Sequence, residues 1–122
     1  MENIEASSID LVLCDLPYGT TACKWDKVLD LKKIWDLLNC INKPFIPIIF
    51  TAKQPFTSIL INSNMDMFKY CCIWVKDNAT NFFSAHYQPL DNTEDIVFFS
   101  TGGKNIGCKN PMTYNPQGLI KV

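Results

Sequence analysis

Hydrophobic and polar residues alternate along the chain in a pattern that predicts strands and helices in turn. Four short runs rich in apolar, β-branched and aromatic residues have the length and composition of strands: residues 9–14, 46–51, 68–75 and 94–100. Between Asp30 and Asn42 the apolar residues recur every three or four positions, which predicts one buried face of a helix with Asp30 as its N-cap. A second helix is predicted over residues 55–64, with proline in its first turn.

The order strand, helix, strand, helix, strand predicts an α/β fold with a mostly parallel sheet flanked by helices. Ligands of such sheets bind beyond the carboxyl ends of the strands, so residues 15–19 and 51–54 are the expected region of a site. Residues 77–92 are long for a loop and are interpreted as a functional or mobile segment. Residues 102–122 show no periodicity and are interpreted as an irregular tail or the start of a connecting segment.

The composition excludes several classes of protein. The chain has 122 residues, of which 48% are hydrophobic, so it supports one folded domain or part of one and is not a disordered protein. It contains no stretch of the ~18 uncharged apolar residues that a membrane span needs. Residues 1–10 carry acidic side chains and lack the basic and apolar regions of a secretory signal. We therefore expect a cytoplasmic protein.

The charged and metal-binding residue types narrow the function further. All 11 basic residues are lysines, and arginine, which makes paired hydrogen bonds to guanine and phosphate, does not occur in the sequence. A protein that grips nucleic acid by itself is therefore not expected. The six cysteines form no CxxC pair and the chain has a single histidine, His86, interpreted as an exposed loop residue, so no metal site is predicted.

The most informative segment follows the first predicted strand and reads Asp15-Leu16-Pro17-Tyr18-Gly19. Asp15 offers a carboxylate as a hydrogen-bond acceptor. The carbonyl of Leu16, restricted toward an extended geometry by the proline after it, offers a second acceptor, and Tyr18 offers a flat ring. Two acceptors beside an aromatic ring suit a planar base that carries an exocyclic amino group. The alternative is an ordinary turn after a strand.

Such a site has a physical rationale for group transfer. The lone pair of an exocyclic amino nitrogen is delocalised into the ring, which makes the nitrogen a poor nucleophile. Hydrogen bonds to both of its N–H groups favour a pyramidal nitrogen whose lone pair can attack an electrophilic methyl group in line. The acceleration then comes from orientation and electrostatics, so Asp15 need not act as a strong base.

The chain resembles the DNA amino-methyltransferases, which methylate adenine N6 or cytosine N4 with S-adenosylmethionine (SAM). The signature of that family is Asp/Asn/Ser-Pro-Pro-Tyr/Phe at the end of a strand. The likeness is greatest to phage and bacterial members that carry this motif near the N-terminus, some of them in restriction–modification systems. The segments that carry the resemblance are residues 15–21, 24–26, 54–57, 67–70, 74–76, 89–90 and 113–117.

The resemblance implies a role for each residue of the motif. Asp15 would accept one hydrogen bond from the target amino group, and the main-chain carbonyl of Leu16 would accept the second. Tyr18 would stack on the flipped base, and Pro17 would hold the shape of the loop. The resemblance also implies that Lys53, Lys76 and residues 77–88 lie near DNA. For each of the two lysines, the alternative is an ordinary solvated lysine at a strand end.

Two departures from the family pattern matter. Leu16 stands where the common signature has its first proline, but the implied role belongs to a backbone carbonyl, which leucine also supplies. The glycine-rich SAM loop is missing, because the cluster Gly102-Gly103 with Gly107 is followed by no amphipathic helix. The implied fold is therefore a partial doubly wound, Rossmann-like methyltransferase domain, with its catalytic-loop half in residues 1–101.

The sequence thus predicts a site-specific DNA methyltransferase that transfers a methyl group from SAM to adenine N6, truncated or one half of a split enzyme. The expected partners are DNA with its target base flipped, and a C-terminal half or a second copy of the chain. Cytosine N4 is an alternative target, since the motif does not distinguish the two. Two other hypotheses are a non-catalytic remnant or binding module of the same fold, and a protein-glutamine or RNA amino-methyltransferase.

Overall fold

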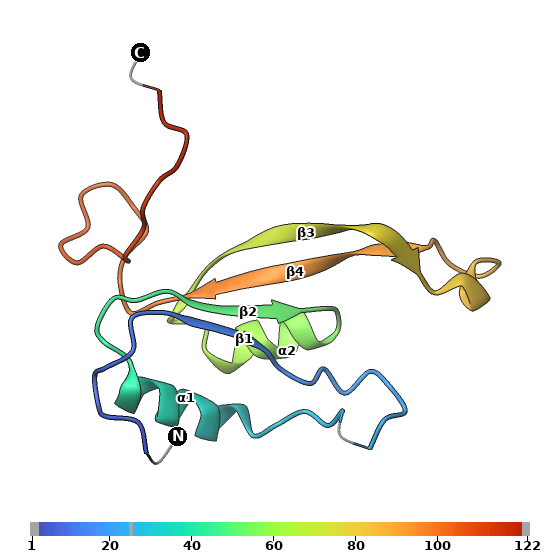
Figure 1. Cartoon of the computed structure of the whole chain (residues 1–122), viewed down its shortest axis with the longest axis horizontal. Helices are drawn as coiled ribbons and strands as arrows, with labels where there is room; N and C mark the ends of the chain where they lie inside the picture. Colours follow the sequence, from blue (N-terminus) through green and yellow to red (C-terminus); the bar gives the residue numbers. More distant parts are fainter. Residues whose placement is uncertain (1–2, 25, 121–122) are drawn as a thin grey trace.

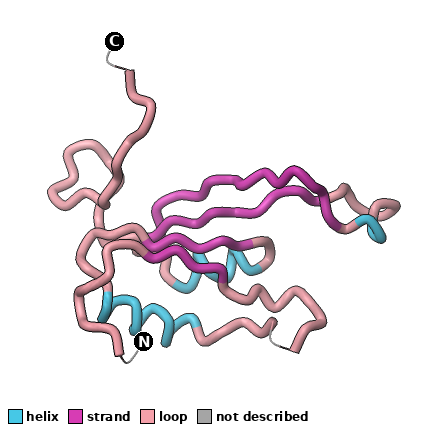
Figure 2. Tube along the Cα trace, in the orientation of Figure 1, coloured by secondary structure: helices cyan, strands magenta, loops and turns pink. Residues whose placement is uncertain are grey.

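A computed structural model describes residues 3–24 and 26–120 of the chain. Its strands are β1 (Val12–Asp15), β2 (Ile48–Ala52), β3 (Phe68–Thr80) and β4 (Asp91–Phe99), and all four belong to one sheet. The helices are α1 (Leu31–Ile41), α2 (Phe56–Ser63) and the single 3-10 turn η1 (Phe82–Ser84). Figures 1 and 2 show both α-helices on one side of the sheet. The predicted order of strands and helices is confirmed.

The sheet is mixed rather than mostly parallel. Its strand order is β1-β2-β4-β3, and only β1 and β2 pair in parallel, because β4 runs antiparallel to both β2 and β3. The expectation of a mostly parallel sheet is therefore met in one pairing of three. The physical reason is the short connection between β3 and β4, which permits a hairpin, whereas a parallel pairing needs a crossover, usually helical, of about a dozen residues or more.

The β3–β4 hairpin is longer than the sequence suggests. We expected residues 77–92 to form a long loop, but β3 continues to Thr80 and β4 begins at Asp91, so only residues 81–90 connect them. This outer part of the hairpin projects beyond the rest of the sheet (Figure 1). Because neither of its faces packs against a core, its sequence lacks the alternation of apolar and polar residues that predicts a strand.

The two α-helices are joined to each other and to the sheet by one apolar core. The side chain of Asp30 caps α1 as predicted, by accepting a hydrogen bond from the amide of Lys33 at 3.3 Å. Trp35 of α1 packs edge-on to Phe50, and its indole N–H donates to the hydroxyl of Ser63 at 2.8 Å. The most deeply buried apolar residues come from β2, α2 and β4: Ile48, Phe50, Ala52, Phe56, Leu60, Val97 and Phe99.

The opposite side of the sheet has no helix packed on it in the described residues. Leu13, Ile49, Phe98 and Tyr70 form one row across it, since each pairs in register with the next. We call this row the open face. Leu13 is 68% exposed, and the groove between the open face and the C-terminal segment has a volume of about 1070 Å³. Exposed apolar surface of this kind marks interaction sites in many proteins.

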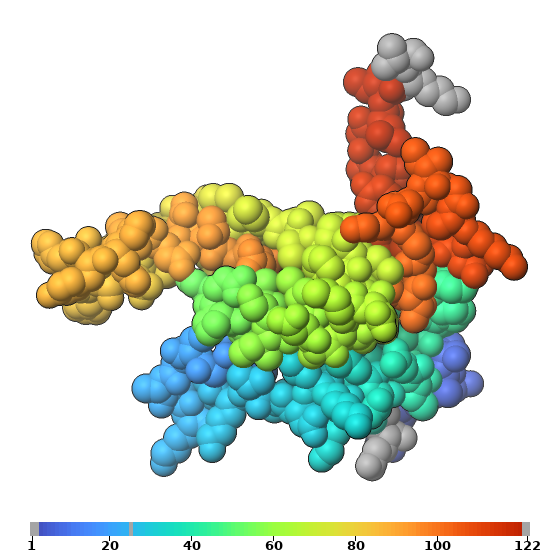
Figure 3. All heavy atoms as spheres, turned by 180° about the vertical axis from the view of Figure 1, so that it is seen from behind, coloured from blue at the N-terminus to red at the C-terminus, as the bar shows by residue number. Residues whose placement is uncertain are grey.

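The segment after β4 contains no helix or strand up to residue 120. It is tied to the body where the amide of Thr113 donates to the carbonyl of Phe45 at 2.9 Å, and Met112 is buried. Beyond this point it extends away from the sheet (Figures 1 and 3). Within residues 3–24 and 26–120, no helix has the length and apolar character needed to cross a membrane.

We predict that the isolated chain self-associates through the open face and the adjoining free edge of β1. Replacing Leu13 with Glu should weaken this association, since a charged side chain would replace an exposed apolar one in the contact. The matched control is Ile59→Glu, which changes a residue 46% exposed on α2, away from the open face. Sedimentation velocity over a range of concentrations measures the effect. A wild-type chain that stays monomeric at every concentration contradicts the prediction.

Candidate active site

The candidate site lies at the carboxyl edge shared by β1 and β2. Asp15 is the last residue of β1, and it pairs in register with Thr51 of β2. Parallel strands end at the same edge, so the pairing brings together two residues that are far apart in the sequence. Asp15 and Thr51, one from each of the two segments expected at strand ends, therefore lie side by side. The outer part of the β3–β4 hairpin extends past the same edge (Figure 1).

Two hydroxyl groups and one carboxylate lie within hydrogen-bond distance of one another at this edge. The Tyr18 hydroxyl donates a hydrogen bond to Oδ1 of Asp15 at 2.8 Å, and the Thr51 hydroxyl donates to the same oxygen at 2.5 Å. The hydroxyls of Tyr18 and Thr51 lie 3.1 Å apart. Asp15 is exposed, whereas Tyr18 and Thr51 are half-buried. The carboxylate is therefore held from the protein side and faces solvent.

The ring of Tyr18 is fixed at a second point. It stacks on Phe56, the first residue of α2, with ring centroids 5.4 Å apart and planes 21° from parallel. Burial is the main cause that raises the pKa of Tyr18 above its ordinary value of 10.0, so its phenol stays protonated at neutral pH and remains a donor to Asp15. The ring is thus positioned by both its hydroxyl and one of its faces.

Leu16 and Pro17 connect this site to the core. The Leu16 side chain is only 9% exposed and belongs to the buried cluster beneath the sheet. An apolar anchor of this kind restrains the loop by packing at the position where the common signature has its first proline. Pro17 is half-buried beside it.

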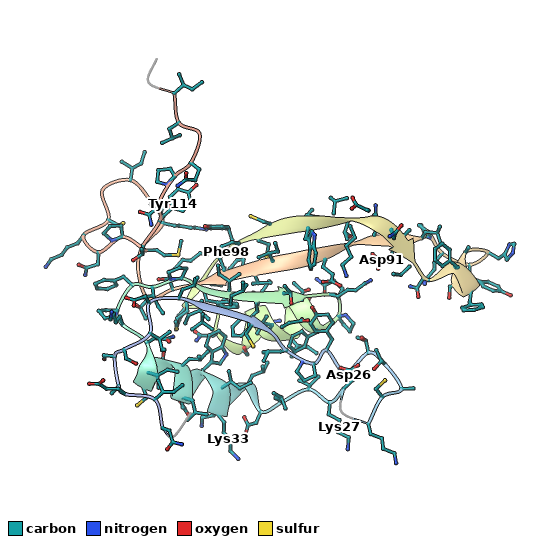
Figure 4. All side chains as sticks on the ribbon, viewed as in Figure 1. Asp26, Lys27, Lys33, Asp91, Phe98 and Tyr114 are labelled. Atoms are coloured by element: carbon teal, nitrogen blue, oxygen red, sulfur yellow. The ribbon has the colours of Figure 1, made fainter. Side chains whose placement is uncertain are left out.

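Asp26 organises the loop that follows, and sequence reasoning did not assign it this role. Its two carboxylate oxygens accept hydrogen bonds from the backbone amides of Gly19 at 2.7 Å and Thr21 at 2.6 Å. Gly19 has a φ of +70°, and a Cβ there would lie 2.9 Å from Cγ2 of Val28, so this turn requires glycine. Figure 4 labels Asp26 on the segment beyond β1. The sequence gives no sign of this role, because the partners of Asp26 are backbone amides, which nearly every residue carries.

The two lysines implied to lie near DNA are both engaged within the chain. Lys53 forms an ion pair with Asp91, and Lys76 forms one with Glu94, so each pairs with a carboxylate of β4. The Lys53 hydrogen bond is the main cause that lowers the pKa of Asp91. Figure 4 labels Asp91 at the base of the projecting part of the hairpin. The structure therefore places both lysines beside the carboxyl edge but with their charges partly neutralised.

The tip of the hairpin carries exposed aromatic side chains. Phe82, Phe83 and Tyr87 are all exposed, and Phe83 is fully so. His86 is exposed on the same tip, as expected. No group of three or more potential metal ligands lies together among residues 3–24 and 26–120.

The glycine cluster near the C-terminus does not fit a cofactor. A Cβ on Gly102 would lie 2.5 Å from the backbone of Met112, and one on Gly103 would lie 2.7 Å from Cβ of Cys108. Both glycines are therefore needed for close packing of the chain against itself, and they leave no cradle for a ligand. These two glycines therefore do not form the glycine-rich loop that the resemblance would require for SAM.

Comparison with known proteins supports a methyltransferase fold. No protein-family model matches the chain, and no curated protein matches it. Solved structures do match, and the mixed α/β architecture of the chain, with one four-stranded sheet and two helices, resembles a methyltransferase fragment.

One of these structures is the crystal structure of the M1.HpyAVI–SAM complex, a SAM-bound DNA methyltransferase. It matches with a TM-score of 0.55 and 17% sequence identity over 90% of this chain. The match takes in 54% of the other chain, so the present chain spans about half of its length. At this identity the likeness shows the fold alone.

Protonation of Asp26 should loosen the loop at Gly19 and Thr21. Hydrogen bonds from Thr21 and then Gly19 hold the pKa of Asp26 below its ordinary value of 3.8, so the carboxylate stabilises the folded loop above that pH. This contribution is lost as the pH falls through the lowered pKa. We expect the amide NMR signals of Gly19 and Thr21 to move in this acid range and Asp26→Asn to abolish the movement.

The matched control is Asp36→Asn, which removes an exposed carboxylate from α1. It should leave the acid titration of both amide signals as it is in the wild-type chain. The role of Asp26 is contradicted if the two signals titrate equally in Asp26→Asn and in the wild type.

Proposed function

We propose that this chain is the target-base half of a DNA amino-methyltransferase, acting in the transfer of a methyl group from SAM to N6 of adenine. The observation that carries the proposal is the pairing of an exposed carboxylate, Asp15, with a fixed aromatic ring, Tyr18, at the carboxyl edge of a methyltransferase-like sheet. This edge is the place where open α/β sheets bind their ligands.

In this proposal Asp15 and the carbonyl of Leu16 accept the two hydrogens of the target amino group. Tyr18 stacks on the flipped base, and Pro17 with the buried side chain of Leu16 keeps the two acceptors in place. The protein contributes orientation and electrostatics rather than a nucleophile, because the attacking atom belongs to the base. Once it carries the methyl group, the amino nitrogen is positively charged and strongly acidic, so its proton passes to Asp15 or to water without any raised basicity of the carboxylate.

SAM is the proposed methyl donor, and its pocket is proposed to lie mainly in a further part of the enzyme. Two observations support this: the matching structure is a SAM complex, and the match takes in 54% of that chain. The described residues offer no glycine cradle, so no step that involves SAM is assigned to them. The open face and the free edge of β1 are the proposed contact for the completing part, either another polypeptide segment or a second copy.

DNA contact is proposed at the same edge. Lys53 and Lys76 are near enough to approach a backbone phosphate there, but each would have to share its charge with Asp91 or Glu94. The net charge of the chain is −1 and the sequence contains no arginine. Most of the phosphate contacts that dominate DNA affinity are therefore proposed to come from the completing part.

The alternative function is a binding module without turnover. The missing glycine cradle favours this alternative. Without a SAM site of its own, the chain transfers no methyl group unless a partner supplies that site. The two hypotheses share the fold and differ in whether a completed assembly has activity.

The central experiment measures transfer of a labelled methyl group from SAM to adenine-containing DNA. The chain is assayed alone and with a candidate polypeptide that carries a glycine-rich SAM loop. We expect transfer by the completed pair and a loss of about 10²- to 10³-fold for Asp15→Ala, the size typical of removing one preorganised polar group from an active site. Asp36→Ala, an exposed change on α1, is the control and should leave transfer unchanged.

Two outcomes oppose the proposal. Transfer that survives Asp15→Ala removes the role of this carboxylate. Failure of every completed pair to transfer a methyl group supports the binding module instead.

A further inference from the structure

Thr51 occupies a position that the resemblance leaves without a role. It lies near the carboxyl end of β2, directly opposite Asp15 in the register of the parallel pair. Its hydroxyl is the only group of β2 that reaches the Asp15 carboxylate among the described residues, and it donates to Oδ1 at 2.5 Å. The backbone pairing and the side-chain hydrogen bond therefore fix the same two residues to each other.

The same hydroxyl also fixes Tyr18. Oγ1 of Thr51 lies 3.1 Å from the Tyr18 hydroxyl, which itself donates to Oδ1 of Asp15. The three groups close a triangle in which every side is within hydrogen-bond distance. Removing one member of such a network weakens the restraint on the other two.

The geometry divides Asp15 into a held oxygen and an available one. Oδ1 accepts from both Tyr18 and Thr51, whereas no hydrogen bond to Oδ2 is found within residues 3–24 and 26–120. A carboxylate that accepts two hydrogen bonds at the same oxygen cannot rotate freely about χ2. Oδ2 is therefore held in one orientation, on a residue that is exposed at the carboxyl edge.

The ring of Tyr18 is likewise held on one side only. One face stacks on Phe56, and the hydroxyl end is held by Thr51 and Asp15. A planar ligand that stacks on Tyr18 would have to use the opposite face, and the hydroxyl end of the ring lies 2.8 Å from Oδ1 of Asp15. Both restraints are made before any ligand binds, which lowers the entropy cost of ordering the site.

We propose that Thr51 is a positioning residue, whose hydroxyl holds Asp15 and Tyr18 so that one carboxylate oxygen and one ring face together receive a flat base bearing an amino group. This inference rests on the proposed function for the identity of the ligand. The restraint itself is a property of the chain alone, so it is measured separately from methyl transfer.

The first test uses NMR of the chain with ¹³C-labelled tyrosine. The ring signals of Tyr18 are assigned by their loss in Tyr18→Phe. Thr51→Val keeps the shape of the side chain and suits a strand but removes the hydroxyl, and we expect it to shift the Tyr18 signals and increase the mobility of the ring. Thr51→Ser restores the hydroxyl and should return the signals toward their wild-type positions.

Thr93→Val is the matched control, since it makes the same change at an exposed position of β4. It should leave the Tyr18 signals unmoved. The inference is overturned if Thr51→Val behaves like this control while far-UV circular dichroism shows that it is folded, or if Thr51→Ser fails to restore what Thr51→Val changes.

The second test places the same variants in the methyl-transfer assay of the completed pair. We expect Thr51→Val to lower kcat roughly 10- to 100-fold with little change in KM for DNA, because misplaced groups slow the chemical step more than they weaken binding. Thr51→Ser should recover most of the rate. Equal kcat for the wild type and Thr51→Val overturns the catalytic part of the inference.

The two tests separate the inference from the proposed function. If the Tyr18 signals respond as expected and the wild-type pair transfers no methyl group, the restraint is present and the proposed function is wrong. If the wild-type pair is active and neither the signals nor kcat respond to Thr51→Val, the proposed function stands and the inference is wrong.

Discussion

The parallel pairing of β1 with β2 is the constraint on which the rest of the site depends. It places Asp15 opposite Thr51, at an edge where both strands end and the chain turns away. The core beneath the sheet holds this pairing in place, because Phe50 of β2 packs against Trp35 of α1 and Phe56 of α2 carries the ring of Tyr18. Helices, sheet and candidate site are therefore parts of one packed unit, in which the loop after β1 inherits its geometry from the core.

Much of this arrangement could be predicted from the sequence. Apolar runs predict the strands, and a helical repeat predicts the helices, because the apolar residues face a core. Asp30 marks the start of α1, because its side chain caps the helix. The segment from Asp15 to Tyr18 is also common turn material, and it stands out because it resembles the signature of a known family at the end of a predicted strand. The outer β3–β4 hairpin could not be found in this way, since neither of its faces is buried and its residues show no alternation.

The contacts that hold the site were also beyond sequence reasoning. Thr51 and Phe56 gain their roles from strand register and from the start of a helix, which no local pattern records. Asp26 acts on backbone amides, which every residue carries. The resemblance implies that Lys53 and Lys76 lie near DNA, but their ion pairs with acidic residues of β4 depend on the antiparallel position of that strand, which the sequence does not record. The role of each candidate residue in methyl transfer stays a prediction.

Asp15 and Tyr18 are proposed to receive a base together, through its exocyclic amino group. The most direct measurement compares two nucleosides that stack alike but differ in their N–H donors, adenosine and N6,N6-dimethyladenosine. The backbone amide signals of Asp15 and Tyr18 are followed by ¹⁵N NMR as each nucleoside is added to the chain. Joint recognition of the base by Asp15 and Tyr18 should give a saturable shift of both signals with adenosine and a much weaker one with the dimethylated nucleoside. Equal shifts with the two nucleosides, or no shift with either, would contradict it.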